Sequence, residues 1–303
     1  MRTRLVGGMA AIAERAATLE DVVCSISKQL DKLYIYLNDF KECPAFFSSY
    51  KNVMPILGAT ACGDLNANGK MYFLQYEKEG LALTLDDDCI YPPHYALAFL
   101  KIFELFKRPV MACVHGSVFA SNPKYYYERA MTFDGRKSQH YNNIVTLCGS
   151  GTAAFPIELV HGSEHDFFSE TYVDLQLSLL AHRAKMPLVS IARPDNWLHF
   201  LGYHGLFQKT QRYISHHTKI LKENVSLIQW EYIRALWREF LSSFASTDWS
   251  DIATKLELSP ASIDFLNGHE YYNGHSAVLQ MDKLIEFSQN LHCIDDPDAR
   301  DNA

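Results

Sequence analysis

The stretch LALTLDDDCIYPPHY, residues Leu81–Tyr95, joins an apolar run of strand character directly to three consecutive aspartates. Adjacent carboxylates repel one another, so such a cluster is either hydrated in an exposed turn or neutralised by a cation. In open α/β sheets, ligands bind beyond the carboxyl ends of the strands. If residues 81–87 form a strand of such a sheet, the aspartates lie where a ligand would bind.

Segments of strand and helix character alternate on both sides of this stretch. The expected strands cover residues 4–9, 32–39, 52–59, 81–87, 109–116, 142–149 and 187–192, and the expected helices cover 18–30, 68–80, 92–108 and 167–185. Apolar runs of strand length separated by segments with helical spacing are typical of α/β proteins. We therefore predict a Rossmann-like, three-layer α/β sandwich with a mostly parallel central sheet over residues 1–200.

The pattern changes after residue 200. Residues 224–244 and 261–291 have amphipathic helical patterns, and residues 294–303 form an acidic tail. Amphipathic helices bury one face against another element. We expect residues 201–303 to form a helical C-terminal extension that packs on the core, or that offers a surface to a second copy or another partner.

Composition and charge limit the function classes. The 303 residues carry a formal net charge of −7, which does not provide the strong basic field that wraps nucleic acid or anionic lipid. The seven cysteines occur without a Cys-x-x-Cys pair, which favours reduced thiols over a zinc site. No segment reaches the length of a membrane span, and the first apolar run is too short for a secretory signal. We expect a cytoplasmic protein, with the inner face of the membrane as an alternative location.

The aspartate cluster itself permits two interpretations. On an extended strand, Asp86 and Asp88 point to one side and Asp87 to the other. Mg²⁺ and Mn²⁺ prefer carboxylate oxygens and keep coordination positions for substrate phosphates, so two acids on one side can share such an ion. Alternatively, the cluster is an acidic turn in which Asp88 caps the helix that starts near Pro92.

The order of the motifs resembles a known family. AIAER (residues 11–15) follows the first strand, LYIYLND (33–39) forms the second, and GDLNANGK (63–70) precedes the aspartates and IYPPHY (90–95). This order is similar to the donor-binding half of GT-A nucleotide-sugar glycosyltransferases, near glycosyltransferase family 2 and the bacterial capsule and O-antigen polysaccharide glycosyltransferases. The resemblance spans residues 4–197 and is strongest over residues 63–95. It implies the GT-A form of the α/β fold.

The resemblance also implies an activity. A glycosyltransferase of this kind moves a sugar from a nucleoside diphosphate, UDP as first choice, to a hydroxyl of a glycan, with Mn²⁺ or Mg²⁺ as cofactor. Inversion is the expected outcome, and retention stays open because both classes share the donor site. A nucleic-acid acceptor is less favoured by the acidic charge.

Residue roles follow from the same resemblance. Asp86 and Asp88 would hold the metal, with His216 or His217 as a third ligand. Asp174 is the first choice for the catalytic base and Glu170 the second, and Val173 replaces the first acid of the family's (E/D)D-x-x-L element. Donor contacts are expected from Ala11, Ile12, Glu14, Asn38, Asp39, Asp64, Asn68, Lys70, Asp86, Asp87 and Arg193, and acceptor contacts from His115, Gly149, Ser150, Gly151 and Trp197.

Two other classes of function remain open. A nucleotidyltransferase also pairs an α/β sheet with acidic metal ligands, but is expected to carry a Gly-rich loop with Arg or Lys after the first strand. Here the two glycines lie inside that strand. A non-catalytic, partner-binding module derived from a transferase is the other alternative, because Val173 leaves the base position with a single acid.

Overall fold

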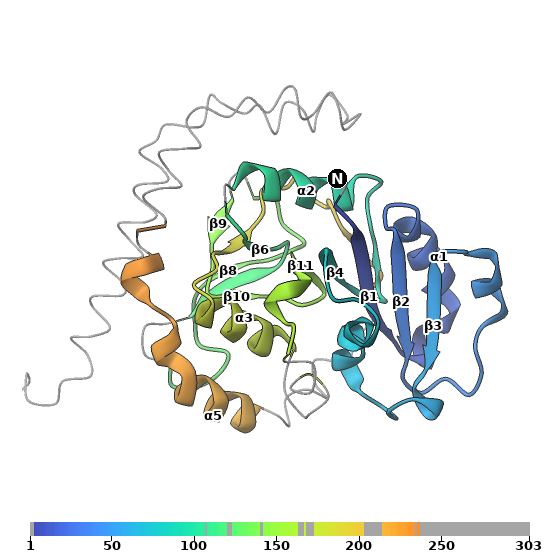
Figure 1. Cartoon of the computed structure of the whole chain (residues 1–303). Coiled ribbons are helices and arrows are strands. Elements are labelled where there is room, and N and C mark those ends of the chain that lie inside the picture. Colours follow the sequence, from blue (N-terminus) through green and yellow to red (C-terminus); the bar gives the residue numbers. More distant parts are fainter. Residues whose placement is uncertain are drawn as a thin grey trace, which may run out of the picture.

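The computed structural model describes residues 3–106, 108–119, 123–139, 142–162, 167, 173–202, 214–233 and 235–236. Within them, an eight-stranded sheet forms the centre of the molecule, in the order β3-β2-β1-β4-β11-β6-β12-β9 (Figure 1). In chain order these strands are β1 (Leu5–Ala11), β2 (Lys32–Leu37), β3 (Val53–Leu57), β4 (Leu81–Asp86), β6 (Met111–Cys113), β9 (Asn143–Ile144), β11 (Thr152–Pro156) and β12 (Leu188–Ser190).

Most pairs in this sheet are parallel. β1 pairs in parallel with β2 and β4, β2 with β3, and β6 with β12. β11 runs antiparallel between β4 and β6, and β9 runs antiparallel along β12. The predicted α/β class with a mostly parallel central sheet is therefore confirmed.

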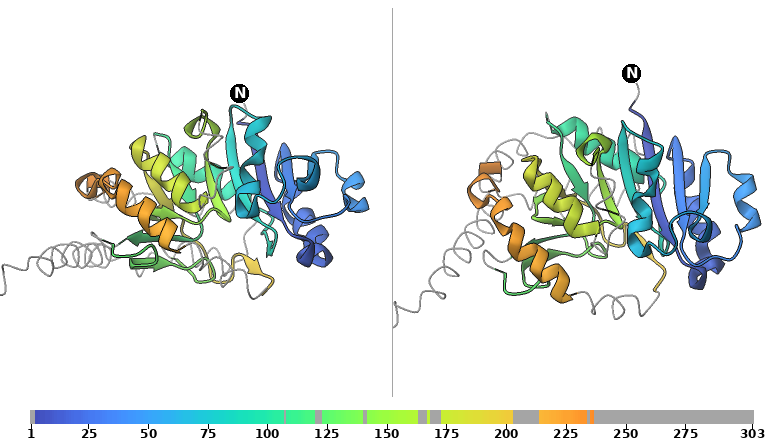
Figure 2. Two further views of the ribbon diagram at one scale, coloured as in Figure 1. Left: turned by 90° about the horizontal axis from the view of Figure 1, so that it is seen from below. Right: turned by 60° about the horizontal axis from the view of Figure 1, so that its bottom comes forward.

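Alternation of side chains along the strands builds two separate cores. Met9 and Leu85 face one side and pack with helices α1 (Ala16–Ser27) and α2 (Tyr95–Leu105). Val6 and Ala82 face the other side and pack with the 3₁₀ helix η4 (Asn66–Gln75) and helix α3 (Val173–Arg183). Figure 2 shows helices on both sides of the sheet. This arrangement is the three-layer sandwich that period-2 strands buried on both faces require.

Two smaller sheets extend the central one. β7 (Gly116–Phe119) lies between β10 (Leu147–Cys148) and β8 (Arg129–Phe133), and β5 (Cys89–Ile90) pairs with β13 (His199–Phe200). The short 3₁₀ helices are η1 (Ala13–Arg15), η2 (Ala45–Ser49), η3 (Gly58–Thr60) and η5 (Ile157–Leu159).

Two predicted strands each divide between two sheets. Residues 109–116 contribute to β6 and β7, and residues 142–149 contribute to β9 and β10. In residues 142–149 the chain passes from one sheet to the other between Val145 and Thr146. The Val145 N–H donates to Leu188 O of the central sheet, and the Thr146 N–H donates to Ser117 O of the small sheet, both at 2.9 Å. Strand β11, residues Thr152–Pro156, is absent from the predicted strands.

The C-terminal region is described as far as residue 236. Helix α5 (Ile214–Asn224) is followed by η8 (Val225–Leu227) and by helical residues 230–233, so the helix predicted from residue 224 begins later. The Tyr232 hydroxyl donates to Lys185 O at 2.7 Å and ties this region to the core. The predicted helix over 261–291 and the acidic tail lie outside the described residues. In the part of the chain that the structure describes, no helix has the length and apolar character to cross a membrane.

Candidate functional site

The aspartate cluster lies at the carboxyl end of β4, beside the end of β1. Asp86 is the last residue of β4 and is level with Ala10 of β1, and Asp87 and Asp88 form the turn that follows. The side chains of Asp86 and Asp88 are 41% and 22% exposed, whereas that of Asp87 is 4% exposed. The two outer acids are therefore accessible to a ligand, and the middle acid is part of the protein interior.

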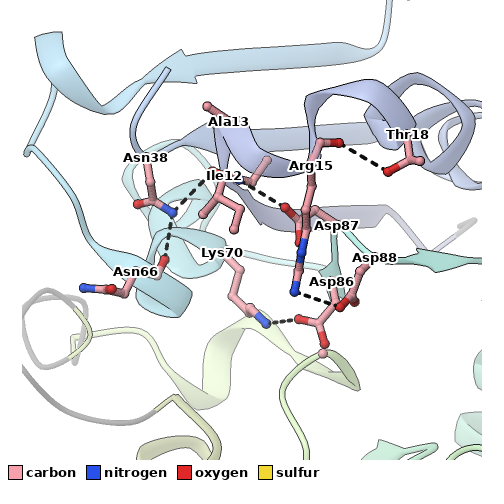
Figure 3. A network of polar contacts seen from close by, with 12 residues as sticks. Ile12, Ala13, Arg15, Thr18, Asn38, Asn66, Lys70, Asp86, Asp87 and Asp88 are labelled. Carbon is pink, nitrogen blue, oxygen red and sulfur yellow. Dashed lines mark hydrogen bonds and ion pairs between the residues drawn. The ribbon is translucent and has the colours of Figure 1, made fainter. Parts of the chain in front are cut away.

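Arg15 holds the buried acid. Its guanidinium forms an ion pair with the Asp87 carboxylate through Nη1 and reaches Asp88 Oδ2 through Nη2 at 3.0 Å (Figure 3). The Ile12 N–H also donates to Asp87, at 3.1 Å. Burial raises the pKa of Asp87 and Arg15 lowers it, so the arginine keeps this interior carboxyl charged. Our sequence reasoning missed Arg15, although three adjacent acids require nearby cations and Arg15 stands in the loop after β1.

Lys70 holds the first aspartate. Its Nζ donates to Asp86 Oδ1 at 2.5 Å, and its side chain is 4% exposed. Burial alone would lower the pKa of Lys70, but Asp86, with Asp174 and Asp87, outweighs burial and raises it. Lys70 reaches this position because η4 lies close to β1: a Cβ at Gly8 would stand 2.1 Å from the backbone oxygen of Lys70. Only glycine permits that approach.

The loop Gly149–Gly151 connects the aspartates to helix α3. A Cβ at Gly151 would lie 1.8 Å from Asp86 Oδ2, so the carboxylate rests directly against this glycine. The Ser150 N–H donates to Asp174 Oδ1 at 2.9 Å, which fixes Asp174 in the first turn of α3. Asp174 is thus placed on the same side of the site as the accessible Asp86.

His115 lines the other side of this loop. The Gly149 N–H donates to His115 O at 2.8 Å, and the Gly135 N–H donates to His115 Nδ1 at 3.3 Å. The residue is exposed by its surface area, yet the protein around the ring lowers the pKa of His115 by desolvation, which Asp174 and Asp134 oppose. His115 is therefore neutral at pH 7, with Nδ1 as acceptor and the proton on Nε2.

The three aspartates share two cationic partners, Arg15 and Lys70. Burial, together with the charges of Asp86 and Asp87, raises the pKa of Asp88 to about 6, and Arg15 and Lys70 oppose this rise. Among the described residues, no group of three His, Cys, Asp or Glu side chains is arranged to hold a metal. Asp86 and Asp88 would supply two carboxylates and leave the other positions to water and diphosphate, as Mg²⁺ and Mn²⁺ allow.

Two histidines proposed as metal ligands lie elsewhere. His216 is exposed on α5, and His217 is buried with its ring centroid 5.4 Å from that of Tyr126. Burial lowers the pKa of His217 to about 4, as expected of a packed imidazole. Neither forms a three-ligand group with the aspartates in the described residues, and a histidine ligand from α5 stays a prediction.

Arg193 is also not at the phosphate position. It is 1% exposed, and its guanidinium donates to Asp134 O at 2.6 Å and to Ile191 O at 2.9 Å. It also donates to Gln139 Oε1 at 3.0 Å. Burial lowers its pKa to about 10. The N–H groups of Arg193 bind the loop between β8 and β9. Arg193 therefore stabilises the fold instead of contacting a nucleotide-sugar donor.

Several predicted donor residues organise the loops around the site. The buried amide of Asn38 accepts from the Leu65 N–H at 3.0 Å and donates to Asn66 O at 3.1 Å. Asp39 accepts from the Ala13 N–H at 2.7 Å, and Asp64 accepts from the Asn66 N–H at 2.8 Å, both on the surface. Base and ribose contacts by these loops stay predictions.

The other predicted residues are placed as follows. Trp197 is half-buried, with its ring centroid 5.4 Å from that of Tyr95, so at least part of it packs in the core. The backbone of His94 caps α2 without a side-chain hydrogen bond, so the alternative in which Asp88 caps this helix is wrong. Ala11 and Asn68 are buried, Ile12 is half-buried and Glu14 is exposed, and Glu170 lies outside the described residues.

No family model matches this chain, and no curated protein matches it. Among solved structures, the chain is similar to the crystal structure of 4-diphosphocytidyl-2C-methyl-D-erythritol synthase from Anaerococcus prevotii, at 15% sequence identity and a TM-score of 0.39. The alignment covers 73% of this chain and 96% of that chain. A likeness this weak supports no statement about function, which has to be argued from the site's own residues.

Proposed function

We propose that the chain is a metal-dependent glycosyltransferase that uses a nucleoside-diphosphate sugar, with UDP as the expected nucleotide. The observation that carries this proposal is the position of Asp86: it ends a parallel strand, binds Lys70 through one oxygen and rests on Gly151 with the other. A carboxylate so placed, beside the accessible Asp88, suits a cation that bridges to a diphosphate.

The donor would be held by charge. Lys70 stands beside Asp86 and supplies a positive charge for a phosphate oxygen. A bound Mg²⁺ or Mn²⁺ would neutralise the charge that develops on the leaving diphosphate. Arg15 keeps Asp87 and Asp88 in place from the protein side.

Transfer would need one proton acceptor. The acceptor hydroxyl gives its proton to the Asp174 carboxylate while its oxygen forms a bond to the anomeric carbon, and the bond from that carbon to the diphosphate oxygen breaks. Ser150 orients Asp174 through its backbone N–H, and neutral His115 offers Nε2–H to the acceptor or the diphosphate. A single base on the acceptor side favours inversion.

Nucleotidyl transfer is a second candidate, favoured by one observation. Such an enzyme is expected to place a cation from the loop after the first strand beside its acidic cluster, and Arg15 does so. The two candidates differ in products: a nucleotidyltransferase releases pyrophosphate from UTP or CTP in the presence of a sugar phosphate. A glycosyltransferase releases UDP from a UDP-sugar.

Replacing Asp174 with asparagine tests the assignment of the base. We expect UDP-sugar turnover to fall by about 10²–10⁴-fold, because the general base is lost, while UDP affinity stays within about threefold. Turnover is measured as UDP released from a panel of UDP-sugars with Mn²⁺, and affinity by calorimetry. Asp195→Asn, an exposed aspartate, is the matched control. Unchanged turnover, or an equal loss of turnover and affinity, would remove Asp174 from this role.

A further inference from the structure

Arg129 on β8 is held in a fixed orientation beside the candidate site. Its guanidinium carbon lies 4.2 Å from the ring centroid of Phe119 and 4.6 Å from that of Tyr126, and its Nε donates to Ser117 Oγ at 2.8 Å. Stacking on two aromatic rings stabilises a guanidinium and fixes its plane. Tyr126 is itself held, because its N–H donates to Thr218 Oγ1 of α5 at 3.0 Å.

One edge of this guanidinium lacks an acceptor. Nη1 is buried and has no hydrogen-bond partner, and no carboxylate of the described residues forms an ion pair with Arg129. Buried polar groups are nearly always paired, because leaving one unpaired costs its full desolvation free energy. A charged donor atom such as Nη1, fixed in this way without an acceptor, is characteristic of a site that receives an anion.

The guanidinium lies near the loop Gly149–Gly151, whose Ser150 N–H donates to Asp174 of α3. His115 directly precedes β7, and Ser117 lies within it, before the register shift between Val118 and Phe119. Ser117, which accepts from Arg129 Nε, is paired with Leu147 of β10, two residues before Gly149. His115 contacts Gly149. Burial lowers the pKa of Arg129, and Asp174 is close enough to oppose that lowering. Arg129 therefore flanks the loop on the small-sheet side, whereas Lys70 and the aspartates lie on the β1–β4 side.

We propose that Arg129 binds an acidic group, a carboxylate or a phosphate, carried by the acceptor substrate. This inference rests on the proposed function and narrows its substrate class to anionic acceptors. The donor diphosphate already has Lys70 and a cation on the opposite side of the loop, so a second anion-binding residue beside Asp174 belongs to the acceptor. Two parallel N–H groups of Arg129 would also orient that acceptor relative to the base.

The test titrates inorganic phosphate, and separately malonate, into the full chain saturated with UDP and Mg²⁺. Saturation occupies the donor site, so that added anions report on a second one. We expect the wild-type chain to bind at least one of the two anions, and Arg129→Gln to weaken that binding by about tenfold or more. Arg129→Lys keeps the positive charge but loses the two parallel N–H groups of the guanidinium, so its anion affinity is expected to lie between those of the wild type and Arg129→Gln. Arg136→Gln, an exposed arginine whose guanidinium lies 4.9 Å from the Phe200 ring, is the matched control and should bind like the wild type.

The outcomes separate this inference from the proposed function. Preferential binding of phosphate or of malonate identifies the acidic group of the acceptor. Equal anion affinity in the wild type and Arg129→Gln, or no anion binding to the UDP-saturated wild type, would overturn the inference while leaving UDP binding intact. Failure of the wild type to bind UDP would instead count against the proposed function. Retained UDP binding by Arg129→Gln and Arg129→Lys shows that these variants fold.

Discussion

Replacing Arg15 with leucine is expected to lower the free energy of unfolding by about 3–5 kcal/mol, because it leaves a buried carboxylate without its partner. Asp87 is 3% exposed and relies on Arg15 and the Ile12 N–H. Urea unfolding measures the loss. Arg136→Leu, which removes an exposed arginine, is the matched control and is expected to change stability by less than about 0.5 kcal/mol.

The destabilisation caused by Arg15→Leu should increase with pH. Burial already raises the pKa of Asp87 in the folded chain, and Arg15 opposes that rise. Without Arg15 the pKa of Asp87 in the folded state moves further above its value in the unfolded state. Between these two pKa values the folded state binds more protons than the unfolded state, so the free energy of unfolding falls as pH rises. The destabilisation is therefore larger at pH 8 than at pH 5. An equal loss at both values, or a loss no larger than in the control, would show that Asp87 does not depend on Arg15.

Replacing Gly151 with alanine should abolish most nucleotide binding. The new Cβ would lie 1.8 Å from Asp86 Oδ2, which forces that carboxylate to rotate away from its contact with Lys70. We expect metal-dependent UDP affinity to fall about 100-fold, the equivalent of about 2.7 kcal/mol. Overpacking at this position should cost about 1–3 kcal/mol of stability.

Gly149→Ala is the control for that experiment. Its Cβ would meet the His115 backbone oxygen at 3.1 Å and would not contact Asp86, although it stands two residues away in the same loop. Calorimetry with UDP and Mn²⁺ compares the two variants. If both lose affinity equally, the loop as a whole supports binding, and the specific contact between Gly151 and Asp86 has no special role.

The parallel half of the fold could be predicted because each of its strands is a separate apolar run. Residues 32–39 and 81–87 were predicted as strands and form β2 and β4 within two residues at each end. Strand β11 was missed since its residues Thr152–Pro156 follow three loop residues and contain two alanines, which favour strands weakly. The division of residues 142–149 between two sheets depends on tertiary hydrogen bonds, which no local pattern reveals.

The site was predictable where a motif marks a strand end. Asp86, Lys70, Gly151 and Asp174 lie around one sheet edge, and their roles there stay predictions. Arg193 and His217 are buried in the fold, and a buried, hydrogen-bonded arginine or a packed histidine looks the same in a sequence as a functional one. Arg15 and Arg129 were missed since their partners come from segments 72 and 12 residues away.

The central claim is that a cation bound by Asp86 and Asp88 holds a nucleoside diphosphate at the end of β4. Titration of UDP by calorimetry, with Mn²⁺ and with EDTA, tests it on the wild type, Asp88→Ala and the exposed control Asp195→Asn. The account predicts binding that requires Mn²⁺, that is lost in Asp88→Ala, and that persists in the control. Binding of equal affinity in EDTA, or undiminished binding by Asp88→Ala, would contradict the metal–diphosphate site. Absence of UDP binding under every condition would contradict the assignment of UDP as the donor nucleotide.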